Sequence, residues 1–166
     1  MKTEGAFFCV MNTETQAALI LANQAIIQYR GTYSRWAALH NLNYHEMLVL
    51  YTIRDAGFCT QKQLCDSFLL PRQTIHNVIQ RMRSAGLLEV SPALSGGREK
   101  AFVLTPAGTE YADVPLRLLS AVEERAVALM GHEKLTAMAN LVLEFDCALN
   151  RAMAAEETQK TEESQS

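Results

Sequence analysis

The amino-acid sequence predicts a mainly α-helical protein with one small β-hairpin, and three observations support this prediction. Apolar residues recur at helical spacing through most of the chain, and helix-capping signals stand where these stretches begin. Residues 87–104 instead contain two short strand-like runs with turn-forming residues between them. The chain has 166 residues, 49% of them hydrophobic and 20% charged, which suffices for a packed core.

Capping residues and terminating glycines mark where the expected helices begin and end. Three pairs have capping-box spacing, namely Thr13 with Gln16, Asn43 with Glu46 and Thr60 with Gln63. Thr105-Pro106 fits an N-cap followed by proline, and Gly57, Gly86 and Gly131 stand where helices should end. The expected helices span 13–40 (with a break near Gly31 as an alternative), 44–56, 60–68, 71–85, 106–130 and 132–154.

The helical pattern is interrupted once. Residues 87–90 and 101–104 are the strand-like runs, and residues 91–98 between them are rich in Ser, Pro and Gly. The element order is that of a winged helix-turn-helix bracketed by long helices. We therefore expect an N-terminal dimerisation helix (1–42), a winged helix-turn-helix domain (43–108), C-terminal dimerisation helices (109–154) and a disordered polar tail (155–166).

Composition and motifs exclude several classes of protein. No apolar run is long enough for a membrane span, and the first five residues do not resemble a secretory signal. Four separated cysteines without a CxxC motif indicate reduced thiols in a cytoplasmic protein. The chain lacks the common nucleophile, phosphate-loop and dinucleotide motifs, so no enzyme activity and no cofactor are expected. His40 and His45 with Glu46 do not have metal-ligand spacing, so no metal site is predicted either.

Positive charge is concentrated in the middle of the chain. The net charge is -3, yet residues 60–100 hold six Lys or Arg against three Asp or Glu. In a helix-turn-helix the second helix enters the major groove of DNA. Here its core face would be Ile75, Val78, Ile79 and Met82, and its other face is polar and rich in amides. The predicted contacts to double-stranded DNA are Lys62, Gln63, Arg72, Gln73, Thr74, His76, Asn77, Arg81, Arg98 and Lys100.

Several motifs resemble the MarR family of multiple-antibiotic-resistance regulators. They are Gln63-Leu64-Cys65-Asp66, the run from Pro71 to Met82, Gly86-Leu87-Leu88, and the run from Arg98 to Gly108, which closes the wing. The resemblance covers roughly residues 13–153. It implies a homodimeric repressor or activator that is released from DNA by a small phenolic or lipophilic ligand, or by oxidation. It also implies base contacts by the start of the second helix and a minor-groove arginine at Arg98.

The sequence departs from the family pattern at two positions. Gly96 stands where the wing has an acidic residue two positions before its arginine. Leu70 precedes Pro71, where the family has a Ser, Thr or Asp N-cap. These departures bear on the individual contacts and leave the fold prediction unchanged.

Two further sites are predicted in the outer helices. The dimer interface is expected at Phe8 and along a heptad-like seam of Leu135, Met138, Val142, Phe145 and Leu149, with packing of the last helix inside one chain as the alternative. Trp36, His40, Tyr44 and Met47 lie where the family has its effector pocket, and aromatic rings with polar tips suit a planar organic ligand.

The predicted function is that of a homodimeric, sequence-specific transcription regulator on a pseudo-palindromic operator, acting as a repressor that a small aromatic or lipophilic effector releases. Two alternatives stay open. One is a winged-helix protein-interaction module without DNA binding. The other is a thiol-based redox sensor, in which Cys9, Cys59, Cys65 and Cys147 are the candidate thiols.

Overall fold

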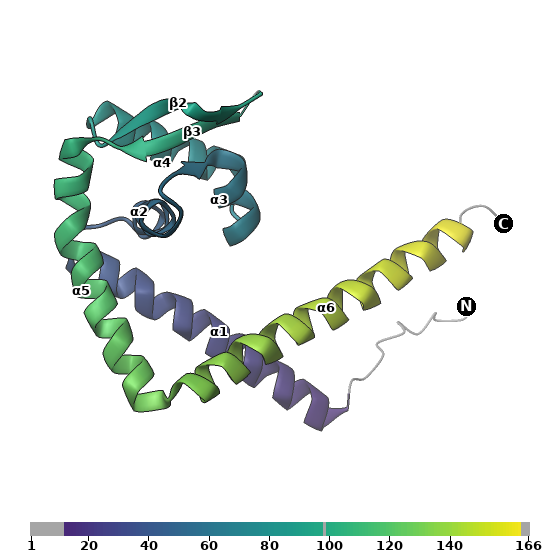
Figure 1. Ribbon diagram of the computed structural model, residues 1–166. Helices are drawn as coiled ribbons and strands as arrows, with labels where there is room; N and C mark the ends of the chain where they lie inside the picture. The colour runs from purple at the N-terminus through teal and green to yellow at the C-terminus, as the bar shows by residue number, and fades with distance from the viewer. Residues whose placement is uncertain (1–11, 98, 164–166) are drawn as a thin grey trace, which may run out of the picture. The chain divides into compact units, whose positions relative to one another are not determined.

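The computed structural model describes residues 12–97 and 99–163 (Figure 1). The sequence-based predictions for Phe8, Cys9 and Arg98 concern residues outside this range. The elements in chain order are α1 (Thr13–Leu39), α2 (Tyr44–Ala56), β1 (Cys59–Thr60), α3 (Gln61–Phe68), α4 (Arg72–Ser84), β2 (Leu88–Gly96), β3 (Glu99–Leu104), α5 (Pro106–Met130) and α6 (His132–Glu163). The chain divides into two compact units that meet at Pro115 within α5, and each unit is described by itself.

Helix starts follow the predicted capping signals at two of three positions. Asn43 and Thr60 each form a complete capping box, in which the cap side chain and the side chain three residues later satisfy each other's backbone N–H groups. The prediction for Thr13 is wrong, because Asn12 is the N-cap and its Oδ1 accepts from the Glu14 N–H at 2.8 Å. Helix α1 is also continuous through Gly31.

The core of the first unit lies between α2, α3, α4 and the sheet. The predicted core face of α4 is confirmed, since Ile75, Val78, Ile79 and Met82 are all buried. They join Leu50 of α2 and Leu64 of α3, which are fully buried. This packing fixes the position of α4 and turns its opposite face toward solvent.

The wing is a longer and less regular hairpin than the sequence predicts. The sheet order is β1-β3-β2, both pairs are antiparallel, and the two-residue strand β1 was not foreseen. Between Ser91 and Gly96 the register shifts, so β2 carries extra residues opposite β3. The Ser95 hydroxyl holds this bulge by donating to the Ser91 carbonyl at 2.7 Å and accepting from the Ala101 N–H at 3.0 Å.

Helix α5 begins against the start of the wing. The predicted Thr105 cap is confirmed, because its Oγ1 accepts from the Gly108 N–H at 3.0 Å. The same hydroxyl donates to the Gly86 carbonyl at 2.6 Å, and the Thr105 N–H donates to the Leu87 carbonyl. These bonds place Gly108 so close to the Leu87 backbone that a Cβ atom there would lie 2.0 Å from the carbonyl oxygen.

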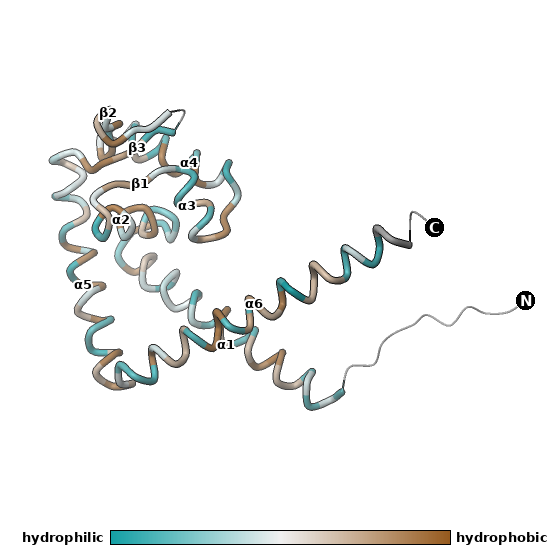
Figure 2. The backbone as a smooth tube through the Cα atoms, turned by 45° about the vertical axis from the view of Figure 1, so that its right-hand side comes forward, coloured by the Kyte–Doolittle hydropathy of each residue, from teal (hydrophilic) through white to brown (hydrophobic). Residues whose placement is uncertain are grey.

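Helix α6 is longer than expected. The prediction of a disordered tail is wrong for residues 155–163, which continue the helix to Glu163. This segment is rich in Ala, Glu, Gln and Lys, which have high helix propensity, and Lys160 pairs with Glu156 one turn earlier. Along α1, α5 and α6, hydrophobic and hydrophilic residues alternate (Figure 2).

The turn between α3 and α4 contains a residue in an unfavourable backbone conformation. Leu69 has φ 49° and ψ 43°, a left-handed conformation that costs a residue with a Cβ atom about 1 kcal/mol or more, and its side chain is 87% exposed. Asparagine tolerates this conformation, as Asn41 does at φ 56°. We expect Leu69→Asn to raise the free energy of unfolding by about 0.5–1 kcal/mol in urea titrations.

The matched control is Leu39→Asn, which removes an equally exposed leucine from an ordinary helical backbone. It should give no gain and a small loss, because asparagine has lower helix propensity. A destabilised Leu69→Asn variant would show that the leucine side chain, rather than the backbone, decides the stability of this turn.

Candidate nucleic-acid interface

The polar face of α4 is open to solvent. Arg72, Gln73, His76 and Asn77 are exposed and Thr74 is half-buried, while the helix packs through its apolar face. The helix starts at Pro71 without a side-chain cap, which agrees with the absence of a capping residue in the sequence. The Gln73 amide Nε2 donates to Asn77 Oδ1 at 2.8 Å, so two amides are held side by side on the exposed face. Paired amides of this kind can read adenine edges.

The start of α3 lies beside the start of α4. The Gln61 amide Nε2 is 3.3 Å from His76 Nδ1, which links the first turn of α3 to the exposed face of α4. Lys62 forms an ion pair with Asp66 at 2.9 Å, and this bond is the main cause of the raised pKa of the lysine. Gln63 is occupied in the capping box of α3, where its Oε1 accepts from the Thr60 N–H.

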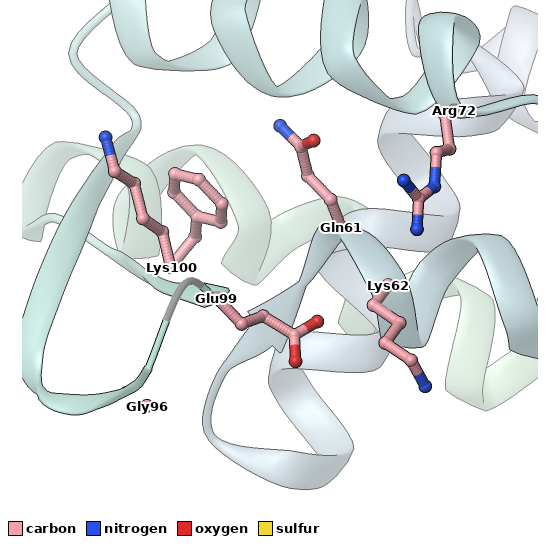
Figure 3. Close-up of a pocket in the computed structure, with 7 residues that line it drawn as sticks. Gln61, Lys62, Arg72, Gly96, Glu99 and Lys100 are labelled. Carbon is pink, nitrogen blue, oxygen red and sulfur yellow. The ribbon is translucent and has the colours of Figure 1, made fainter.

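A cleft of about 670 Å³ opens between the wing and the starts of α3 and α4 (Figure 3). Lys62, Arg72 and Lys100 supply positive charge around it, from α3, α4 and β3 respectively. Its other lining residues are Gln61, Gly96, Glu99 and Phe102. The cleft therefore brings together three of the cations predicted to contact DNA, and it lies next to the exposed face of α4.

Sequence reasoning missed the acidic residue in this cleft. Glu99 extends from β3 toward α3, and its Oε1 accepts a hydrogen bond from the Thr60 hydroxyl at 2.7 Å (Figure 3). Thr60 also caps α3, so one hydroxyl joins the wing to the helix. The two residues are 39 positions apart, and no local sequence pattern points to their contact.

Arg81 is engaged by a partner that the sequence did not suggest. Its Nε donates to Glu46 Oε1 at 3.0 Å, and the Glu46 side chain is only 14% exposed while that of Arg81 is 55% exposed. The other Glu46 oxygen accepts from the Asn43 N–H. Partial burial and the Glu46 carboxylate raise the pKa of nearby Tyr111, and Arg81 opposes this shift. A largely buried carboxylate of α2 is thus neutralised by an arginine of α4.

We expect Arg81→Ala to lower the free energy of unfolding by about 1–2 kcal/mol, because the Glu46 carboxylate would lose its cation. The measurement is urea unfolding. Arg83→Ala is the control, since this exposed arginine lies on the same helix turn and, among residues 12–97 and 99–163, its guanidinium is seen only at 6.0 Å from the Phe102 ring centroid. Adding Glu46→Gln to Arg81→Ala should recover part of the loss, and a purely additive double variant would contradict the pairing.

The predicted effector residues lie at the junction of α1 and α2. Trp36 and His40 stack with ring centroids 4.1 Å apart, and His40 Nδ1 lies 2.9 Å from the Trp36 carbonyl oxygen. Tyr44 is half-buried, and its ring meets that of His45 edge-on. Met47 is 2% exposed and belongs to the core. Three of the four residues therefore present polar or aromatic edges at this junction.

The described cysteines differ in their environment. Cys59 is buried in β1, and burial raises its pKa to about 12, whereas Cys65 is half-buried and Cys147 is exposed. Because the thiolate is the reactive form, Cys59 is unsuited to oxidant sensing. We expect iodoacetamide at pH 8 to leave Cys59 unmodified in the native protein and to alkylate it in urea, as read by peptide mass spectrometry. Rapid native alkylation of Cys59 would contradict its burial.

The outer helices expose many apolar side chains. On α6, Met138, Val142, Phe145 and Leu149 of the predicted seam are 37–48% exposed, and Leu135 is half-buried. On α1, Leu21 and Ile27 are each 69% exposed. In residues 12–97 and 99–163, no helix is both long and apolar enough to cross a membrane.

Comparisons with known proteins agree with this architecture. Residues 40–99 match the model of the MarR family. A MarR family regulator from Neisseria meningitidis is similar in structure, with a TM-score of 0.76 and 22% identity over 84% of this chain and 98% of that one. The MepR–DNA complex of S. aureus gives a TM-score of 0.59 and 13% identity over 78% of this chain and 96% of that one.

A third similar structure is MarR of Staphylococcus aureus in complex with salicylate and kanamycin, with a TM-score of 0.61 and 17% identity over 84% of this chain and 95% of that one. No curated protein sequence matches the chain. Residues 40–99 thus resemble the winged-helix domain of the MarR family, and the chain as a whole shares the fold of these similar structures.

Proposed function

We propose that the protein is a transcription regulator that binds a specific DNA operator as a homodimer in the cytoplasm. The observation that carries this proposal is the exposed amide-rich face of α4 directly beside a cleft lined by Lys62, Arg72 and Lys100. Amides can discriminate bases, and cations bind phosphates without sequence preference, so the two features together suit an operator. The similar MepR structure was determined as a complex with DNA.

The proposed contacts fall into two groups. Gln73, Thr74, His76 and Asn77 face base edges in the major groove, and Arg98 enters the adjacent minor groove. Backbone phosphates are bound from both sides of the cleft and from α4; the residues are Lys62, Gln63, Arg72, Arg81 and Lys100. Arg81 keeps its Nε on Glu46 and offers its outer nitrogens to a phosphate, since a guanidinium has five N–H donors.

The dimer is proposed to form through the outer helices. The α6 seam from Leu135 to Leu149 exposes apolar side chains at heptad-like spacing, which would be buried against a second copy, together with Phe8. A dimer would place two α4 helices on half-sites about 34 Å apart, which matches a pseudo-palindrome.

A small aromatic or lipophilic effector is proposed to act at Trp36, His40 and Tyr44, next to the core residue Met47. Similar structures have been determined with 4-hydroxyphenylacetate and with salicylate, both of which are aromatic acids. The dimer binds the operator only when its two α4 helices have the spacing of the half-sites. An effector that binds more tightly to dimers with another spacing would increase their population and so lower operator affinity. With this arrangement the protein acts as a repressor that the effector releases.

The test is binding of the full-length protein to genomic DNA fragments, including its own promoter, at several salt concentrations. A nanomolar, sequence-selective complex whose affinity falls steeply with salt supports the proposal. Weak and unselective binding at every salt concentration would overturn it in favour of a winged-helix protein-interaction module. The selective fragment then serves to screen aromatic acids and oxidants for release of the protein.

A further inference from the structure

We propose that Glu99 sets the level of DNA affinity by opposing phosphates in the cleft, while leaving sequence preference unchanged. This inference rests on the proposed function. It concerns an acidic side chain at the centre of a basic surface, between the wing and the first turn of α3. The side chain also joins the wing to α3 through Thr60, but the oxygen of a neutral amide would accept the same hydrogen bond.

The carboxylate of Glu99 is fixed in place rather than free to turn away. Its Oε1 accepts from the Thr60 hydroxyl at 2.7 Å, and the residue is half-buried. The backbone of β3 is paired at Glu99 with Gly96 of β2 and at Ala101 with Thr60 of β1. A DNA phosphate that enters the cleft therefore meets this negative charge.

The negative charge of Glu99 is close enough to change the pKa of a lysine in the cleft. Besides its main partner Asp66, Lys62 has its pKa raised by Glu99 and lowered by Arg72, which means that these three charges interact. Asp66 and Glu99 both act on Lys62, one of the three cations around the cleft. The cleft as built thus has a smaller positive potential than its lysines and arginine alone would create.

The expected effect follows from the range of a single charge. Before screening by salt, a unit charge about 8 Å from a phosphate in mostly aqueous surroundings changes affinity about threefold per half-site and about tenfold for a dimer, and about 0.1 M salt reduces the dimer factor to about threefold. Phosphates are present in every DNA sequence, so this factor should be the same for operator and non-operator duplexes. Lower overall affinity would keep the protein from being held on non-operator DNA and would ease its release by an effector.

The experiment compares Glu99→Gln with Glu89→Gln in the full-length protein. Glutamine keeps an oxygen that can accept from Thr60 and removes only the charge. Glu89 is an exposed acidic residue of β2 outside the cleft, so its substitution changes the net charge equally. Affinities for an operator and a scrambled duplex are measured at about 0.1 M and about 0.5 M salt, and unchanged thermal melting confirms that both variants are folded.

We expect Glu99→Gln to bind both duplexes about threefold tighter at the lower salt, with the difference shrinking at the higher salt, and Glu89→Gln to stay within about twofold of the parent protein. Affinity equal to or lower than that of the parent would overturn the inference, as would a gain restricted to the operator or one that persists at high salt. If the parent protein binds no duplex at either salt concentration, the proposed function and this inference fall together. If it binds and Glu99→Gln brings no gain, only the inference falls.

Discussion

Replacing Gly108 with alanine is expected to lower the free energy of unfolding by about 3 kcal/mol or more. A Cβ atom at this position would lie 2.0 Å from the Leu87 carbonyl oxygen and 2.9 Å from its carbon. The carbonyl cannot simply move aside, because it accepts the Thr105 N–H at 3.1 Å. The substitution must therefore separate the start of α5 from the start of the wing. Urea unfolding monitored by circular dichroism measures the loss.

Gly31→Ala is the matched control, because it makes the same chemical change in another helix. A Cβ atom at Gly31 would meet only the Arg35 guanidinium at 3.7 Å, which is ordinary contact. This variant should be more stable than the parent by about 0.5–1 kcal/mol, since alanine has the higher helix propensity. Equal changes in the free energy of unfolding for Gly108→Ala and Gly31→Ala would show that the close contact between Gly108 and the Leu87 carbonyl does not exclude a side chain.

Asn77→Ala is expected to remove about 1–3 kcal/mol of base discrimination per half-site, and so about two to four orders of magnitude in operator affinity for the dimer. Asn77 is exposed on α4, and its Oδ1 holds the Gln73 amide, so the substitution removes one reader and releases the second. The measurement is the ratio of affinities for operator and scrambled duplexes. This ratio should fall for Asn77→Ala, with little change in its affinity for scrambled DNA.

Lys100→Ala provides the contrast for this prediction. Lys100 lines the cleft and is proposed to bind only phosphate. Its loss should weaken binding to both duplexes and reduce the salt dependence, while the ratio stays the same. An unchanged ratio for Asn77→Ala would mean that α4 does not enter the major groove in the proposed orientation.

Much of the fold could be predicted because its signals are local. The capping boxes at Asn43 and Thr60, the terminating Gly57 and the apolar face of α4 each depend on residues within one or two helical turns. Such patterns can be recognised in a sequence because the side chains and backbone groups that interact lie on the same or adjacent turns of a helix. The same reasoning failed at the C-terminal end, where polar composition suggested disorder but helix propensity extends α6 to Glu163.

The features that sequence reasoning missed depend on contacts between distant segments. Strand β1 has only two residues and exists because Cys59 and Thr60 pair with β3. The Glu46–Arg81 pair joins residues 35 positions apart, and the Thr60–Glu99 bond joins residues 39 apart. Side chains of these types are usually solvated, so no pattern marks them in advance. The basic residues of the cleft were predicted one by one, but the acidic residue among them was not.

The two carboxylate oxygens of Glu46 bind two different elements of the fold. One oxygen completes the first turn of α2 at Asn43, and the other holds Arg81 on α4. Fraying of that first turn would therefore also free the Arg81 side chain, while the buried face of α4 keeps the helix in place. Amide hydrogen exchange would register this as weaker protection at the start of α2 in Arg81→Ala than in the parent protein. One carboxylate thus couples the stability of the first turn of α2 to the side-chain position of a cation on α4.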